Sequence, residues 1–282
     1  PCLRGVLALF EAMGLETALA APTGRAAKRL GELCSTEAST IHRLLETGFD
    51  PHTGQLVFTR NEYDPLEVDA VIVDEVSMVD ITLMQALIEA LPHGARLILV
   101  GDADQLPPVG PGNFLRDIIG SHRVPTIQLT DIFRQAQQSD IVMNAHAVNE
   151  GHMPVPSGAD GDFFFLKRSD PAAVIETVAQ LCAARLPNHY GLLPSQIQVL
   201  SPARRQGSGT IALNRRLQEA LNPPAEDKLE KRFGDWIFRE GDRVMQVRNN
   251  YDIIWEKREN DEQGTGIFNG DVGEILQIFP RQ

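Results

Sequence analysis

VIVDEVSMVD, residues 71–80, is the stretch of this sequence that decides the fold. It begins with three β-branched apolar residues, as in a strand of a parallel sheet that is covered on both faces. Two carboxylates, Asp74 and Glu75, follow directly. Ligands of such sheets bind at the carboxyl ends of the strands, where acidic groups can serve a magnesium nucleotide. The same two acids could equally cap the next helix, so this segment alone leaves both interpretations open.

A second strand end favours the nucleotide interpretation. Residues 97–100 are another short apolar run, and GDADQLPPVG follows at 101–110. Gly101 permits a tight exit from the strand, and the two prolines stiffen the loop, which holds Gln105 near the strand end. Residues 81–91 between the two strands read as a helix. The pattern predicts a βαβ unit of an α/β domain.

The two segments together resemble motifs II and III of superfamily-one DNA helicases, with the RecD-like group, which translocates 5′ to 3′, as the nearest match. AAPTGRAAKRL at 20–30 resembles motif Ia, TIHRLL at 40–45 resembles motif Ib, and LTDIFRQ at 129–135 resembles motif IV. The similarity continues through VLSPARRQGSGTIALNRRLQEALNP, GDRVMQVRNNY and GIFNGDVGEI. The motifs keep the order of the family over nearly the whole chain.

The phosphate loop of such enzymes, G-x-x-x-x-G-K-[ST], does not occur in the sequence. That loop cradles the phosphates with backbone amides and contacts them with its lysine. In the family it precedes the helix that leads to motif Ia, and residues 3–13 read as that helix. Nothing resembles motifs V and VI either. The sequence therefore reads as an internal piece of a longer helicase, and we expect the piece by itself to be inactive.

The resemblance implies an α/β fold with two RecA-like parallel-sheet domains, the first one truncated at its N-terminus. The first domain is expected at 1–140 and contains a β-hairpin pin at 46–69, with Thr53-Gly54 in the turn. The second is expected at 141–234, with strands at 163–166 and 197–200 and a helix that begins at Asp170-Pro171. The aromatic run at 163–165 is expected to be core rather than a base-stacking platform.

An inserted SH3-like β-barrel is expected at 235–282, after a charged connector at 226–235. Its strands are expected at 242–248, with Val244 and Val247 inward, and at 272–278, preceded by a tight turn at Asn269-Gly270-Asp271.

The resemblance also implies roles in ATP hydrolysis, with ATP and Mg²⁺ as cofactors. Asp74 would hold Mg²⁺, and Glu75 would activate the attacking water. Gln105 would sense the γ-phosphate, and Arg134 would stabilise charge on the transferring phosphoryl group. Asp74, Glu75, Gln105 and Arg134 are therefore the expected catalytic and nucleotide-binding residues.

The expected DNA contacts follow from motif positions and from residue types that bond phosphates or stack on bases. For His42, a structural role is an equal alternative, and turn formation is an equal alternative for the two asparagines. The expected DNA-binding residues are Pro22, Thr23, Gly24, Arg25, His42, Arg204, Arg205, Asn249, Asn250 and Tyr251.

Composition bounds the class of protein. The net charge of -12 is unusual for a DNA-binding protein, so a local basic track would have to contact single-stranded or tailed duplex DNA. No apolar stretch approaches the roughly 20 residues of a membrane span, which argues against a membrane partner. The three cysteines have no metal-binding spacing, as in a reduced cytoplasmic protein.

The function expected from the resemblance is an ATP-dependent DNA helicase in repair or recombination. Three alternatives remain open from the sequence. The chain could be a non-catalytic RecA-like interaction module, the helicase part of a conjugative relaxase, or a helicase subunit whose partners are the other subunits of a nuclease complex.

Overall fold

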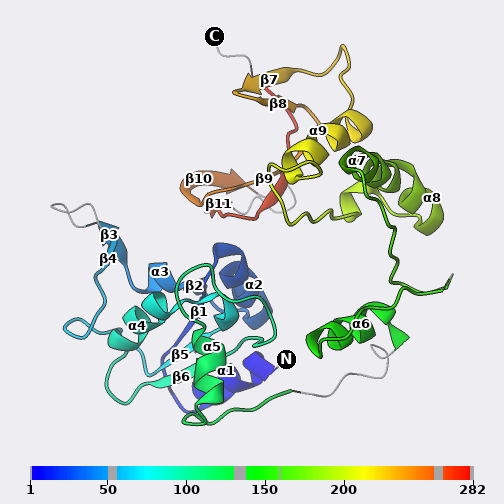
Figure 1. Ribbon diagram of the computed structural model, residues 1–282. Helices are drawn as coiled ribbons and strands as arrows, with labels where there is room; N and C mark the ends of the chain where they lie inside the picture. Colours follow the sequence, from blue (N-terminus) through cyan, green and yellow to red (C-terminus); the bar gives the residue numbers. More distant parts are fainter. Residues whose placement is uncertain (1, 50–55, 130–137, 159, 257–262, 280–282) are drawn as a thin grey trace. The chain divides into compact units, whose positions relative to one another are not determined.

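The computed structural model describes residues 2–49, 56–129, 138–158, 160–256 and 263–279. The chain divides into two compact units, one of residues 1–131 with 246–271 and one of residues 132–245 with 272–282. Each unit is described by itself (Figure 1). The domain boundaries predicted near residues 140 and 234 stay predictions. Within the described residues, no helix has the length and apolar character needed to cross a bilayer.

A four-stranded parallel sheet forms the centre of the first unit (Figure 1). Its strand order is β2-β1-β5-β6, and each neighbouring pair is parallel. The α/β fold class predicted from the two strand ends is therefore confirmed. The strands are β1 (Thr17–Ala21), β2 (Ala38–Thr40), β5 (Ala70–Val73) and β6 (Arg96–Leu99).

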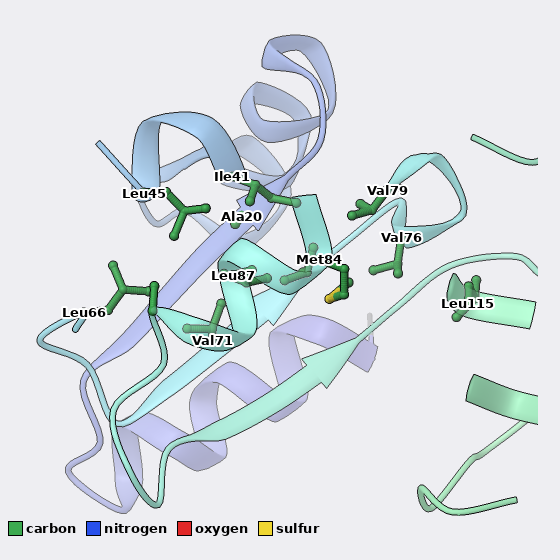
Figure 2. Packing of buried hydrophobic residues seen from close by; sticks show 12 residues of the cluster. Ala20, Ile41, Leu45, Leu66, Val71, Val76, Val79, Met84, Leu87 and Leu115 are labelled. Atoms are coloured by element: carbon green, nitrogen blue, oxygen red, sulfur yellow. The ribbon is translucent and has the colours of Figure 1, made fainter. Parts of the chain in front are cut away.

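Helices cover both faces of this sheet, which is why β5 is apolar at every position. Val71 and Val73 face one apolar cluster, whereas Ala70 and Ile72 face another, and all four are fully buried. The first cluster is covered by α3 (Ile41–Leu44), α4 (Ile81–Glu89) and α5 (Phe114–Gly120), and the second by α1 (Cys2–Ala12) and α2 (Gly24–Cys34). Figure 2 shows Met84 and Leu87 of α4 beside Val71 in the first cluster.

Two antiparallel hairpins complete the first unit. β3 (Thr47–Phe49) pairs with β4 (Leu56–Phe58), so the hairpin predicted between motifs Ib and II is present. Its predicted turn at Thr53-Gly54 lies outside the described residues. The other hairpin joins β10 (Asn250–Glu256) to β11 (Gln263–Ile267). The predicted tight turn after β11 is confirmed, since Gly270 has φ +95° and the Asp271 N–H bonds to the Phe268 carbonyl.

The described part of the second unit is mainly helical. The predicted helix starting at Asp170-Pro171 is confirmed, with the Asp170 side chain accepting the Ala173 N–H at 2.9 Å. An ion pair of 2.9 Å between Arg216 and Glu176 joins the last helix to this one. The helical segments are α6 (Asp140–Asn149), α7 (Pro171–Gln180), a π-helical turn (Leu181–Arg185), α8 (Leu186–Tyr190), a 3-10 turn (Pro194–Gln196) and α9 (Thr210–Leu221).

The strands predicted at 163–166 and 197–200 do not form, although both segments are described. A strand exists only where a neighbouring strand completes its hydrogen-bond ladder, and neither segment has such a neighbour in the described part of the unit. Phe164, Phe165 and Leu200 are 51%, 70% and 87% exposed, so these apolar runs do not form a core here. The expectation that the aromatic run at 163–165 is core is therefore wrong for this unit.

The strands of the second unit lie near its C-terminal end. β7 (Glu230–Phe233) pairs with β8 (Trp236–Arg239), and β9 (Arg243–Met245) pairs with β12 (Val272–Glu274). The predicted connector at 226–235 thus contains a strand, and the strands predicted at 242–248 and 272–278 are shorter than expected. Val247 in the first unit is 70% exposed, not inward, because the β9–β12 ladder ends before it.

Candidate nucleotide and DNA site

The carboxyl ends of the parallel strands bring most of the predicted motifs to one edge of the first unit's sheet. β1 leads into Pro22-Thr23-Gly24, and β2 leads into α3, which carries His42. β5 ends at Asp74-Glu75, and β6 leads to the loop of residues 101–112. Strands of one parallel sheet have their carboxyl ends on the same edge, and ligands bind there in α/β proteins.

The backbone turns sharply at the Asp74-Glu75 pair. The Asp74 N–H bonds to the Ala20 carbonyl of the neighbouring strand at 2.9 Å, and Asp74 Oδ1 accepts the Glu75 N–H at 2.9 Å. Glu75 itself has left-handed backbone angles, φ 55° and ψ 39°. A non-glycine residue pays about 1 kcal/mol for this conformation, and such outliers concentrate at functional sites.

Neither acidic side chain is neutralised by a cation in the described part of the chain. Asp74 Oδ2 and the Glu75 carboxylate have no hydrogen-bond or ion-pair partner among the described residues. The described residues also hold no cluster of three or more histidine, cysteine, aspartate or glutamate side chains that could bind a metal by itself. The pair therefore fits a hard cation whose other oxygen ligands come from a nucleotide and water.

The loop of residues 101–112 packs closely on the turn that follows the acidic pair. A Cβ at Gly101 would lie 3.1 Å from the backbone nitrogens of Val76 and Ser77, so a side chain at this position would crowd the approach. The buried Ser77 hydroxyl donates to Gln105 Oε1 at 3.3 Å. Farther along, the Ile81 N–H donates to the Pro111 carbonyl at 2.9 Å. Gln105 is thus held beside the turn that follows β5, whereas the sequence predicted only that it lies near the end of the strand at 97–100.

Asp80, at the N-terminus of α4, touches the same loop. Its carboxylate caps the helix by accepting the Leu83 N–H at 2.8 Å. A Cβ at Gly110 would lie 1.9 Å from Asp80 Oδ2, so the loop backbone rests directly on this carboxylate. The sequence prediction missed both roles of Asp80. The cap could have been predicted, since an acid before a helix is a recognised N-cap signal, but the contact with Gly110 could not.

The N-terminus of α2 contains the predicted motif Ia residues. Thr23 caps it by accepting the Ala26 N–H at 3.2 Å. Arg25 donates to the Gly270 carbonyl at 3.3 Å, and a Cβ at Gly24 would lie 2.6 Å from the Phe268 ring. The turn after β11 therefore covers one side of this helix end. Thr23 caps only one backbone amide of the first turn. The remaining amides and the helix dipole favour an anion at this position.

A pocket of about 200 Å³ continues from this helix end. Lys28 of α2 and Arg43 of α3 supply its cations, and Trp255 of β10 and Phe268 supply its aromatic rings. Cations next to aromatic rings are the composition of a site for single-stranded nucleic acid. The sequence prediction missed Trp255 and Phe268 because their sequence positions lie far from α2.

His42 is half-buried and packs against the β3–β4 hairpin. Its ring centroid lies 5.9 Å from that of Phe58 in β4, with the two ring planes at 50°. Burial lowers the pKa of its imidazole below the usual 6.5, and the nearby Asp80 carboxylate opposes part of that shift. The structure thus joins His42 to the hairpin, and the charge of Asp80 at the start of α4 acts on its ring.

The remaining predicted site residues lie elsewhere. Arg204 and Arg205 are exposed in the second unit, in the loop before α9. Asn250 Oδ1 accepts the Asp252 N–H at 3.2 Å, a local turn contact, whereas Asn249 Oδ1 accepts the Asn269 N–H at 2.9 Å, a contact between distant segments. Tyr251 is placed in β10 by its backbone. Arg134 lies outside the described residues.

Comparison with known families matches both parts of this architecture. The family described as "AAA domain" matches residues 1–162, and "ATP-dependent RecD-like DNA helicase SH3 domain" matches residues 213–282. The chain belongs to the RecD-like superfamily-one helicases. The C-terminal segment of this RecD-like chain is accordingly an SH3-like domain, as predicted.

Individual relatives of this RecD-like chain agree with the family. It is 39% identical to the "ATP-dependent RecD2 DNA helicase" of Deinococcus radiodurans over 274 residues, which are 97% of this chain and 34% of that protein. It is 32% identical to the "RecBCD enzyme subunit RecD" of Mycobacterium tuberculosis over 289 residues, covering 92% of this chain and 46% of that protein. The chain therefore spans between a third and a half of these relatives.

Among solved structures, one titled "Structural Basis for DNA Unwinding at Forked dsDNA by two coordinating Pif1 helicases" aligns with 96% of this chain and 63% of the chain in that structure. The sequence identity is 18% and the TM-score is 0.46. A likeness at this level does not extend to function.

Proposed function

We propose that the complete protein is an ATP-dependent DNA helicase that unwinds duplex DNA 5′ to 3′ along single strands, in DNA repair or recombination. One observation carries the proposal. The acidic pair Asp74-Glu75 follows the central strand, with no cation paired to either carboxylate among the described residues, and Gln105 is tied to the same turn through Ser77. A nucleotide and DNA would meet at this edge, since the motif Ia helix begins there too.

Mg²⁺ would be held by Asp74 and would neutralise charge on the phosphate groups of ATP. Glu75, which has left-handed backbone angles, would orient and deprotonate a water. Gln105 can donate from its amide nitrogen to a phosphate while its Oε1 accepts from Ser77. Arg134 is proposed to stabilise charge on the transferring group, although it lies outside the described residues. The chain contains no phosphate loop, so we expect no turnover from these 282 residues alone.

The proposed path of the DNA strand runs over α2 and α3. The N-terminus of α2 with Thr23 and Arg25 would bind a phosphate, and Lys28 and Arg43 would bind its neighbours. Trp255 could stack on a base in the same pocket. Arg204 and Arg205, in the second unit, are proposed as separate contacts to DNA phosphates. The β3–β4 hairpin is proposed as the pin that separates the duplex strands.

The direction and the activity are tested together. The complete protein should unwind a duplex with a 5′ single-stranded tail and leave a 3′-tailed duplex intact, with ATP turnover stimulated by DNA. Equal unwinding of both substrates would refute the direction, and absence of DNA-stimulated turnover would refute the proposal as a whole.

A helicase subunit of a nuclease complex is the second candidate. The 32% identity to a RecBCD subunit over 92% of this chain favours it. Unwinding by the purified protein alone supports a stand-alone helicase, whereas unwinding that appears only with added partner subunits supports this second candidate.

A further inference from the structure

The base of the β3–β4 hairpin is bound to the short helix α3 by several contacts. The Thr47 hydroxyl donates to the His42 carbonyl at 2.5 Å, and the His42 ring packs on Phe58 at a centroid distance of 5.9 Å. Thr47 and Phe58 are paired residues of the two strands. His42 therefore contacts both strands of the hairpin, one with its backbone and one with its side chain.

His42 also lies within the electrostatic reach of Asp80, which in turn contacts the loop of residues 101–112. The Asp80 carboxylate acts on the imidazole, and Gly110 rests on that same carboxylate. The loop is tied to α4 through Pro111 and to the turn after Glu75 through Gln105 and Ser77. Contacts thus run from the acidic pair through the loop to Asp80, and from His42 to the hairpin. The electrostatic influence of Asp80 on the imidazole links the two sets.

We propose that His42 is a positioning residue that couples the loop of residues 101–112 to the β3–β4 hairpin. The inference rests on the proposed helicase function, in which this loop follows the state of the nucleotide and the hairpin separates the strands. The coupling acts through the contact between the His42 and Phe58 rings and through the Asp80 carboxylate. A shift of the loop moves Asp80, and His42 carries that shift to the base of the hairpin.

The alternative role of His42, a contact to a DNA phosphate, fits the structure less well. An exposed, charged donor binds a phosphate more strongly than a neutral, partly buried one. The imidazole is half-buried against Phe58, and burial lowers its pKa, which favours the neutral ring. Its neighbour Arg43 is exposed, lines the pocket beside α2, and suits that task better.

The test measures base pairs unwound per ATP hydrolysed in the complete protein, with DNA-stimulated ATP turnover measured separately. His42→Ala should lower the number of base pairs per ATP about threefold to tenfold while turnover stays near the wild-type rate, because residues that carry coupling modulate it by this much. His42→Phe keeps a ring against Phe58 and should restore most of the loss. His93→Ala is the matched control, since His93 is exposed in the turn before β6, at the opposite edge of the sheet.

A second variant keeps the inference testable if His42→Ala does not fold. Phe58→Leu retains an apolar side chain but removes the ring, and it should also lower the base pairs per ATP. When combined with His42→Ala, it should add little further loss, since both changes break one contact. An unchanged ratio in Phe58→Leu would overturn the proposal.

Other outcomes also decide against the inference. If His42→Ala lowers turnover and unwinding in equal proportion, the residue has only a structural role. If it weakens binding of single-stranded DNA and leaves the base pairs per ATP unchanged, His42 is a DNA ligand. If the wild-type protein neither hydrolyses ATP nor unwinds DNA, the proposed function is refuted. That outcome is distinct from failure of the inference, which is judged only by comparing the variants with an active wild-type protein.

Discussion

The apolar runs of the first unit and those of the second unit have similar sequences and different structures. Ile72 in β5 is fully buried between helices, whereas Leu200, in a run of the same type, is 87% exposed. β5 has a parallel neighbour on each side, but residues 197–200 have none in the described part of the chain. Apolar character predicts that a segment can be a buried strand, and the presence of neighbours decides whether it becomes one.

The largest expected effect concerns chemistry at the first unit's sheet edge. Glu75→Gln in the complete protein should reduce ATP turnover about 100-fold or more, because the amide cannot accept a proton from water. Nucleotide binding should persist, since the shape of the side chain is kept. Steady-state ATPase assays and nucleotide binding check this, with Glu89→Gln on α4 as a control. Turnover at the wild-type rate would remove Glu75 from the mechanism.

The contrast between the two apolar runs has a direct test. Ile72→Ala should lower the free energy of unfolding by about 3 kcal/mol, through lost burial and a cavity in the sheet. Leu200→Ala should change it by less than about 0.5 kcal/mol, as for an exposed side chain. Urea denaturation and hydrogen exchange of the corresponding peptides in the complete protein provide the measurements. A large loss from Leu200→Ala would mean that the complete protein buries this run.

Helix caps allow a comparison in which the two units should behave alike. Asp80 and Asp170 each accept one backbone N–H at the start of a helix, at 2.8 and 2.9 Å. Asp80→Ala and Asp170→Ala should each cost about 1 kcal/mol of helix stability. Faster hydrogen exchange in the first turns of α4 and α7 would show the loss. Protection of α7 that does not respond to Asp170→Ala would contradict the role of this cap.

The smallest expected effect is a pH dependence that belongs to the first unit. Burial lowers the pKa of His42 in the folded state below 6.5, so the unfolded chain binds more protons in the window just below that pH. Stability contributed by the neutral ring is therefore present above 6.5 and is lost as the pH falls through this window. His42→Phe should make the decline in stability between about pH 6.5 and 5 shallower. An unchanged pH profile in thermal unfolding would show that His42 titrates equally in both states.

Much of the candidate site could be predicted because the relevant signals are local. A strand that ends in two acids, and a second strand that ends in glycine and a proline-stiffened loop, placed Asp74, Glu75 and Gln105 at one sheet edge. The contacts of Asp80 with Gly110, of His42 with Phe58 and of Gly24 with Phe268 could not be predicted in this way. Each joins residues from different elements, and nothing in either local sequence specifies the other partner.

The sequence by itself determined the α/β class, the cap of α7, the hairpin between motifs Ib and II, and the membership of the RecD-like family. These follow from side-chain periodicity, capping chemistry and motif order, which act over a few residues. The tertiary structure decided which apolar runs became strands, how long β9 and β12 are, and which side His42 faces. Those outcomes depend on hydrogen-bond ladders and burial between distant segments, and such interactions exist only once the chain has folded.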